Sequence, residues 1–286
     1  MQATLNGVDI YYEVMGEGAP LIAVHGGPGM SDNRGYVQWL RPLADSYQVV
    51  SYDLRGCGKS GDAPDGSYSH ADFVADLDAL RDHLGFERFA LLGTSYGGFI
   101  SLEYAVRHGD RLTHLILQDT APSHHNETAA RENALRSGLP GITTEQLDRL
   151  FGGRVADDDE FRSSFAAIQP LYRTTEDPER DAERLAGIVF RYKTHNFAFS
   201  RNIPQYDLRD RLGEIRVPTL VMVGRHDWIT PVDQAEYLAS HIPNARLRIF
   251  EHSGHGPMIE ENEAFIACVR DFLAGVPAAA ATSAQG

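Results

Sequence analysis

The order of apolar runs along the chain limits the fold more than any other feature. Compact runs rich in β-branched residues recur between longer stretches with helical spacing, and each run has the length of one buried strand. The predicted strands are residues 21–26, 47–54, 89–93, 112–119, 219–224 and 245–251. The predicted helices are residues 70–84, which follow the capping residue Ser69, and 96–108, 232–241 and 260–274. Such an alternation predicts a mostly parallel sheet of buried strands with helices on both faces.

Two regions depart from this alternation. Asn6-Gly7 is a strong hairpin signal, so two antiparallel strands are predicted within residues 3–15. The stretch from 121 to 205 is charged and helix-like, and one expected helix there has a face of large apolar residues, Phe161, Phe165, Ile168 and Tyr172. We interpret this stretch as a helical insertion that lies over the sheet as a cap.

These patterns divide the chain into three parts. Residues 1–120 and 206–275 are expected to form the core domain, residues 121–205 the helical cap, and residues 276–286 a disordered tail without large apolar groups. One large domain with an insertion also agrees with a length of 286 residues and a hydrophobic content of 42%.

The charge of the chain argues against two classes of partner. The formal net charge is −14, so the overall field repels nucleic-acid backbones and anionic lipid headgroups. The first residues, MQATLNGVDIYYEV, lack the basic start and apolar core of a signal peptide, and no stretch approaches about 18 apolar residues. We therefore expect a cytoplasmic protein that binds neither nucleic acid nor membranes. Cys57 and Cys268 are expected to be free thiols in a reducing compartment.

The segment Gly93-Thr94-Ser95-Tyr96-Gly97 matches the G-x-S-x-G pattern of a nucleophile elbow. It follows the predicted strand FALL and precedes the predicted helix YGGFISLEYAVRH, which is the structural context that the pattern requires. The flanking glycines allow a tight turn that presents the serine hydroxyl at the edge of the sheet. Ser95 is therefore predicted to be a nucleophile rather than a structural turn residue.

A serine hydroxyl needs a general base, and the base needs a carboxylate that orients it. Asp227 follows the predicted strand TLVMVG, and His255 lies in the loop after ARLRIFE. Because the carboxyl ends of parallel strands meet at one edge of a sheet, both are predicted to lie near Ser95. His252, which is closer to its strand, competes for the role of base, and Asp119, at the end of strand 112–119, competes for the role of acid.

A reacting carbonyl also needs donors for its developing oxyanion. The N–H group of Tyr96, directly after the serine, is one expected donor. The other is an N–H group in the loop HGGPG (25–29), with Gly27 the favoured residue, because several glycines directly after a strand indicate a shaped backbone site.

Five segments together carry a resemblance to a known family: HGGPG (25–29), YDLRGCGKS (52–60), GTSYGG (93–98), GRHDWITP (224–231) and SGHGP (253–257). They resemble the prolyl aminopeptidase (proline iminopeptidase) branch of the α/β-hydrolase superfamily. The resemblance implies an α/β-hydrolase fold with an eight-stranded, mostly parallel sheet and a helical cap. It also implies a serine hydrolase that uses Ser95, Asp227 and His255 through an acyl-enzyme. It further implies a structural loop beside the pocket, formed by Asp53, Arg55, Gly56, Gly58 and Ser60.

The chain departs from this branch in one respect. Aminopeptidases of the branch hold the substrate ammonium with cap carboxylates, so the resemblance predicts acidic residues in the cap. Residues 190–202, where we expect them, contain no acid but the cations Arg191, Lys193 and Arg201. Glu176 and Asp207 are nearby substitutes. A carboxylesterase, lactonase or amidase therefore stays open beside the aminopeptidase.

No cofactor or metal ion is predicted. Adjacent side chains such as His124 and His125 tend to point apart, and no spacing of cysteines or carboxylates completes a metal site around them. A non-catalytic ligand receptor and a cofactor-free perhydrolase are weaker alternatives. The expected substrate is a small ester, lactone, amide or short peptide, and a homo-oligomer is left open.

Overall fold

The computed structural model describes residues 1–64, 66–175 and 177–275, and within these ranges the fold is built on a single eight-stranded sheet. The strands are β1 (Gln2–Leu5), β2 (Val8–Met15), β3 (Ala19–Val24), β4 (Tyr47–Tyr52), β5 (Phe89–Thr94), β6 (Leu112–Gln118), β7 (Thr219–Gly224) and β8 (Ala245–Phe250). Their order across the sheet is β1-β2-β4-β3-β5-β6-β7-β8. β1 and β2 pair antiparallel, β2 joins β4 antiparallel, and all later pairs are parallel. The predicted α/β fold and the hairpin at Asn6-Gly7 are both confirmed.

Helices cover both faces of the sheet, and a separate apolar cluster fills each face. One cluster contains side chains from α2 (His70–His83), α3 (Tyr96–His108) and α9 (Val232–His241). The other contains side chains from α1 (Arg34–Trp39), α10 (Pro257–Glu260) and α11 (Asn262–Leu273). This arrangement is the one expected for parallel strands, whose two faces both exclude water.

The local signals account for most of these boundaries. Ser69 caps α2 in a capping box with Asp72, as a serine before a helical run should. The predicted helix 260–274 is confirmed as α11, and the short α10 precedes it. One expectation was wrong: β8 is an edge strand whose Leu247 side chain is exposed, so it is not buried on both faces.

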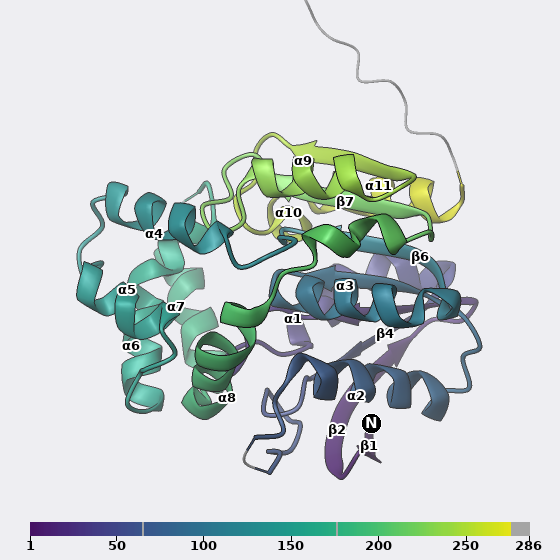
Figure 1. Cartoon of the computed structure of the whole chain (residues 1–286), viewed down its shortest axis with the longest axis horizontal. Helices are drawn as coiled ribbons and strands as arrows, with labels where there is room; N and C mark the ends of the chain where they lie inside the picture. Colours follow the sequence, from purple (N-terminus) through teal and green to yellow (C-terminus); the bar gives the residue numbers. More distant parts are fainter. Residues whose placement is uncertain (65, 176, 276–286) are drawn as a thin grey trace, which may run out of the picture.

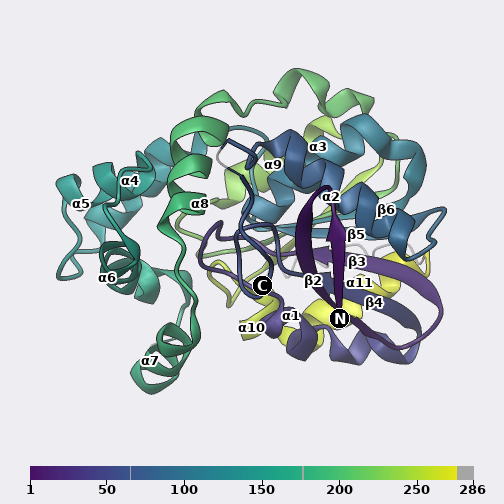
Figure 2. The same ribbon diagram turned by 90° about the horizontal axis from the view of Figure 1, so that it is seen from below.

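The part of the chain between β6 and β7 that carries α4 to α8 is helical and lies to one side of the sheet, as Figures 1 and 2 both show. Its α-helices are α4 (Asn126–Arg136), α5 (Thr144–Phe151), α6 (Asp158–Ile168), α7 (Pro178–Gly187) and α8 (Tyr192–Phe197). We refer to residues 121–205 as the cap segment. Its interior is a third apolar cluster that includes Phe161, Phe165 and Ile168, the face expected from the sequence. Shorter segments are 3-10 helices at Arg41–Asp45, Gly109–Arg111, Gln169–Tyr172, Ile203–Gln205 and Arg209–Glu214, and a π-helical turn at Ala198–Asn202.

The cationic start of α8 fastens the cap segment to the core. Arg191 pairs with Asp62 at 2.7 Å, and its guanidinium also donates to the carbonyl oxygens of Gly58 and Ser60. Its backbone N–H donates to the Gly29 carbonyl at 2.7 Å. Arg191 therefore holds the cap against two loops of the core. No helix in the described part of the chain is long and apolar enough to cross a membrane, and the predicted tail at 276–286 lies outside the described residues.

Candidate active site

The turn between β5 and α3 holds Ser95 in a backbone conformation that side chains rarely adopt, with φ 55° and ψ −122°. Such a conformation costs on the order of 1–3 kcal/mol and persists where the surroundings enforce it. The surroundings here are tight. A Cβ atom at Gly93 would lie 2.2 Å from Ser101 Oγ, and one at Gly97 would lie 2.3 Å from the Val24 carbonyl oxygen. Both glycines of the motif are therefore required by close packing.

The loop after β3 lies directly against this turn. A Cβ atom at Gly26 would lie 2.7 Å from Ser95 Cβ, and Gly27 has a positive φ of 57°. Among the described residues, neither the N–H of Gly27 nor that of Tyr96 has a hydrogen-bond acceptor. Both residues line a cavity together with Ser95. The two predicted oxyanion donors are thus brought to the serine with their N–H groups unused.

Asp227 and His255 form a hydrogen bond of 2.7 Å between the aspartate Oδ2 and the histidine Nδ1. The Asp227 side chain is fully buried and also accepts hydrogen bonds from the N–H groups of Ile229 and Thr230 and from the Thr230 hydroxyl, at 2.7–3.0 Å. These donors fix the carboxylate and leave its Oδ2 directed at the imidazole. Asp227 therefore fixes the orientation of the ring, and Nε2 is the nitrogen left for proton transfer.

The environment of His255 favours its protonated form. Burial lowers the pKa of this imidazole, but the charge and hydrogen bond of Asp227, together with the charge of Asp119, outweigh burial, and the pKa lies above its ordinary value of 6.5. Tyr172 of the cap segment also contacts His255. The backbone N–H of His255 donates to the Tyr172 carbonyl at 2.9 Å, and the two rings meet edge to face with centroids 5.3 Å apart. The cap thereby positions the loop that carries the histidine.

Asp119, the competing acid, lies beside this pair without bonding to it. Its carboxylate accepts hydrogen bonds from the Gly224 N–H and the Gln118 amide, both at 3.0 Å. Burial raises the pKa of Asp119 to about 7, and the nearby Asp227 carboxylate acts in the same direction. The carboxylate that contacts the His255 ring is therefore Asp227.

Asp119, Asp227 and His255 offer three possible metal ligands within 4.8 Å of one another. The 2.7 Å separation of the Asp227 and His255 atoms is a hydrogen-bond distance. Ligand atoms around a tetrahedral zinc ion, each about 2.0–2.2 Å from it, are farther apart than that. The geometry suits an acid–base pair.

The other candidates from the sequence lie elsewhere. His252 is exposed and lines a separate surface hollow with Arg173 and Glu260. The rings of His124 and His125 lie 4.4 Å apart, so the expectation that they point apart was wrong. The Nδ1 atom of His124 lies 3.0 Å from the Tyr206 carbonyl oxygen, and that of His125 lies 3.2 Å from the Ser123 hydroxyl.

The loop at residues 53–60 is held by interactions within the fold. Asp53 accepts from the N–H groups of Asn33 and Lys59 at 2.7 Å, and Arg55 forms a two-pronged ion pair with the buried Asp76 at 2.6 Å. The Cys57 thiol is free and buried, which raises its pKa to about 12. None of these groups lines the cavities around Ser95.

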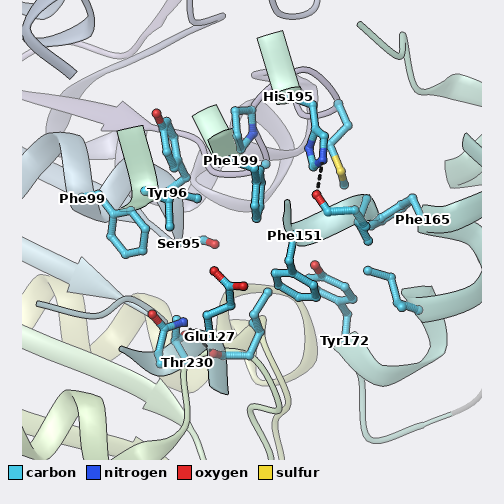
Figure 3. A pocket seen from close by; sticks show the side chains of 18 of the residues that line it. Ser95, Tyr96, Phe99, Glu127, Phe151, Phe165, Tyr172, His195, Phe199 and Thr230 are labelled. Carbon is cyan, nitrogen blue, oxygen red and sulfur yellow. Dashed lines mark hydrogen bonds between the residues drawn. The ribbon is translucent and has the colours of Figure 1, made fainter. Parts of the chain in front are cut away.

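Ser95 opens into a cavity of about 90 Å³ that is walled mainly by aromatic and aliphatic side chains (Figure 3). The aromatic residues are Tyr96, Phe99, Phe151, Phe161, Phe165, Tyr172 and Phe199. His195 also lines it, and burial lowers the pKa of this imidazole to about 4, so the ring is neutral. A single carboxylate enters this space among the described residues: Glu127, from the first turn of α4, points toward Ser95 in Figure 3.

Sequence reasoning missed Glu127, because it searched residues 190–202 for an acid. That stretch does contribute to the cavity, but through His195 and Phe199, while its cation Arg191 faces the core. Asp207 pairs with Arg209 at 2.6 Å and does not line the cavity, and Glu176 lies outside the described residues. One signal was present: Glu127 lies in the first turn of the first cap helix, soon after β6, whose carboxyl end lies at the same edge of the sheet as Ser95.

Comparisons with known proteins identify the family of the chain. Residues 19–262 match the family described as alpha/beta hydrolase fold. The proline iminopeptidase PfmaB of Pestalotiopsis fici is 33% identical over 276 residues, covering 94% of this chain and 97% of its own length. The proline iminopeptidase of Lactobacillus helveticus is 30% identical, with 93% and 95% of the two chains covered.

Two solved structures extend the comparison to three dimensions. The enol-lactonase from Burkholderia xenovorans LB400 superposes with a TM-score of 0.78 at 27% identity, covering 96% of this chain and 100% of the other. The esterase EaEST from Exiguobacterium antarcticum gives a TM-score of 0.75 at 25% identity, covering 96% and 98%.

Proposed function

The chain belongs to the α/β-hydrolase family, and we propose that it is an aminopeptidase of the proline iminopeptidase type, which releases the N-terminal residue of a short peptide through an acyl-enzyme on Ser95. Three features support this proposal. The serine lies in a strained elbow, an imidazole oriented by a carboxylate lines a cavity with it, and an acidic side chain enters the apolar space beside it. The names of its relatives point the same way.

In the proposed reaction, His255 Nε2 takes the hydroxyl proton of Ser95 while Oγ forms a bond to the substrate carbonyl carbon. The N–H groups of Gly27 and Tyr96 donate to the resulting oxyanion. The C–N bond then breaks, and His255 returns its proton to the leaving amine. Water attacks the acyl-enzyme with His255 again as base, and the free amino acid leaves. Asp227 holds the imidazole and stabilises its charged form throughout.

The position of Glu127 favours an aminopeptidase over an esterase. A substrate ammonium that enters an apolar cavity loses its hydration, which is unfavourable unless a carboxylate pairs with it. The cavity supplies that carboxylate beside Ser95. Its Oε1 accepts from Arg131 at 2.8 Å, and Arg131 is shared with Asp148 at the same distance. Glu127 is thus held by one oxygen, and its other oxygen is left for a substrate amine.

The shape of the cavity supports a small cyclic or aliphatic N-terminal residue. Its volume is about 90 Å³, and rings such as Phe99, Phe151 and Phe199 form its walls. Apolar walls favour a substrate side chain without polar groups. A proline ring fits this description, since it is compact, apolar and carries its charged nitrogen next to the reacting carbonyl.

The experiment compares proline p-nitroanilide with N-acetylproline p-nitroanilide. We expect the purified protein to hydrolyse the first at least about a hundredfold better in kcat/KM, because acetylation removes the charge that Glu127 pairs with. Glu127→Gln should lower kcat/KM for the free amine by about ten- to hundredfold and have little effect on the acetylated compound. Glu132→Gln, an exposed position on the same helix, is the matched control and should behave as the wild type.

Equal hydrolysis of both anilides by the wild type would contradict the proposal. A protein that cleaves p-nitrophenyl acetate but does not prefer proline p-nitroanilide over its N-acetyl form is an esterase or lactonase, the alternative that the sequence left open.

A further inference from the structure

A second cavity meets the first at Ser95. It has a volume of about 330 Å³ and is lined by Ser95 and Gly27, by His255, and by α1 and the cap helix α7. The first cavity is lined by Ser95 but not by His255. Because the base delivers its proton to the departing group, the cavity that contains His255 is the one that holds the leaving group. The two cavities thus divide the substrate at the scissile bond.

Three arginines line this second cavity, and two of them have partners. Arg34 pairs with Asp32 at 2.6 Å and also donates to the Gly187 carbonyl at 2.5 Å. Arg173 pairs with Asp181 at 2.5 Å. The third, Arg184, makes no hydrogen bond or ion pair with any residue that the structure describes, although it is partly buried.

The charge of Arg184 acts on groups around the cavity. Burial raises the pKa of Tyr36 to about 12, and the Arg184 charge works against that rise. The Arg184 charge also acts to lower the pKa of Tyr172 and of His255, which line the same cavity. Burial and the Arg173 guanidinium lower the pKa of Arg184 itself, and the Asp181 carboxylate that opposes this is already bound to Arg173. Arg184 therefore lines the cavity without a carboxylate partner of its own among the described residues.

An unpaired guanidinium in a partly buried cavity calls for an anion. Arginine carries a fork of N–H donors that matches a carboxylate in two parallel hydrogen bonds. Two acidic residues also line the cavity: Asp32 is already paired with Arg34, and Glu183 is exposed. A ligand carboxylate could therefore approach Arg184 from within the cavity, while Glu183 keeps its hydration.

We propose that Arg184 binds a carboxylate on the leaving group, so that the preferred substrates are dipeptides with a free C-terminus. This inference rests on the proposed aminopeptidase function, in which the leaving group of a dipeptide is an amino acid. Glu127 then contacts the substrate amine on one side of Ser95, and Arg184 contacts the carboxylate on the other. The two charges set the length of the substrate.

The test uses paired substrates that differ only in this carboxylate. Pro-Ala with a free C-terminus should be cleaved with about ten- to hundredfold higher kcat/KM than Pro-Ala-amide. Arg184→Gln should reduce this ratio to near one, and Arg184→Lys, which keeps a charge but not the fork, should retain part of it. Arg180→Gln, an exposed arginine on the same helix, is the matched control and should keep the wild-type ratio.

A second pair separates this inference from the aminopeptidase proposal, because it contains no amine. The pair is 4-acetoxybenzoate and its methyl ester, whose leaving phenols differ by a carboxylate. The phenols differ in reactivity, so the measured quantity is the change in their kcat/KM ratio between wild type and Arg184→Gln. A fall in the carboxylate preference with the esters, together with no peptide cleavage, would support the Arg184 site and reject the aminopeptidase. Peptide cleavage with a free-acid to amide ratio that Arg184→Gln leaves unchanged would reject the Arg184 site alone.

Discussion

Substitution of one glycine tests whether the position of Ser95 is set by backbone packing. Gly26 has no positive φ, so an alanine there is not strained by its backbone conformation. Its Cβ atom, however, would lie 2.7 Å from Ser95 Cβ and 2.9 Å from the Thr94 carbonyl oxygen. Apolar atoms pack at about 3.5–4.0 Å, so Gly26→Ala must separate the two loops by about 1 Å.

A displacement of this size has a calculable effect. A misplacement of about 1 Å at a reacting group lowers the rate by on the order of a hundredfold, which corresponds to about 2.7 kcal/mol of activation free energy. Overpacking should also destabilise the fold by about 1–3 kcal/mol. We expect Gly26→Ala to lose about a hundredfold in kcat while remaining folded at room temperature.

The assay measures kcat with p-nitrophenyl acetate, the rate of Ser95 labelling by a fluorophosphonate, and the melting temperature. Gly109→Ala is the control, because Gly109 has a helical φ of −59° at the end of α3 and a Cβ atom added there would meet no described part of the chain within 4 Å. It should keep wild-type kcat and be neutral or slightly more stable. A Gly26→Ala enzyme with kcat within about threefold of wild type would refute the argument that this contact positions the serine.

Three further predictions follow from the same geometry. Ser95→Ala should remove nearly all turnover and all fluorophosphonate labelling, and labelling of another residue in the wild type would contradict the assignment. The acidic limb of kcat/KM should have a midpoint above pH 6.5, because His255 must be neutral to accept a proton and its pKa is raised; a midpoint below pH 6 would contradict this. Asp227→Asn should lower kcat by on the order of 10⁴-fold, because an amide would hold the wrong imidazole tautomer, and should move the acidic limb to lower pH. An unchanged limb in this variant would mean that another carboxylate, such as Asp119, raises the pKa of His255.

The candidate site shows which reacting groups can be proposed from sequence. Ser95 was identifiable because its chemistry is tied to a local pattern: glycines at fixed offsets, a strand before and a helix after. Asp227 and His255 were identifiable because strand ends in a parallel sheet gather at one edge, whatever the loops between them contain. Both inferences depend on backbone topology, which hydrophobic periodicity largely determines.

The cap segment shows where such reasoning stops. Its helices were predictable as helices, but an amphipathic pattern does not state which neighbouring surface a polar side chain will meet. Arg191 and Glu127 illustrate this, since the cation turned toward the core loop and the acid toward the serine. The sequence of each helix does not indicate which surface its charged side chain will contact.

The sequence by itself determined the order of the elements, the elbow and the choice of candidate reacting groups, because these follow from residue periodicity and from glycine positions along the backbone. Only the tertiary structure decided which charges surround the serine. The unpaired state of Arg184 and the raised pKa of Asp119 arise from groups far apart along the chain that become neighbours in a partly dry interior. Burial and pairing are properties of that packed arrangement, and no local segment encodes them.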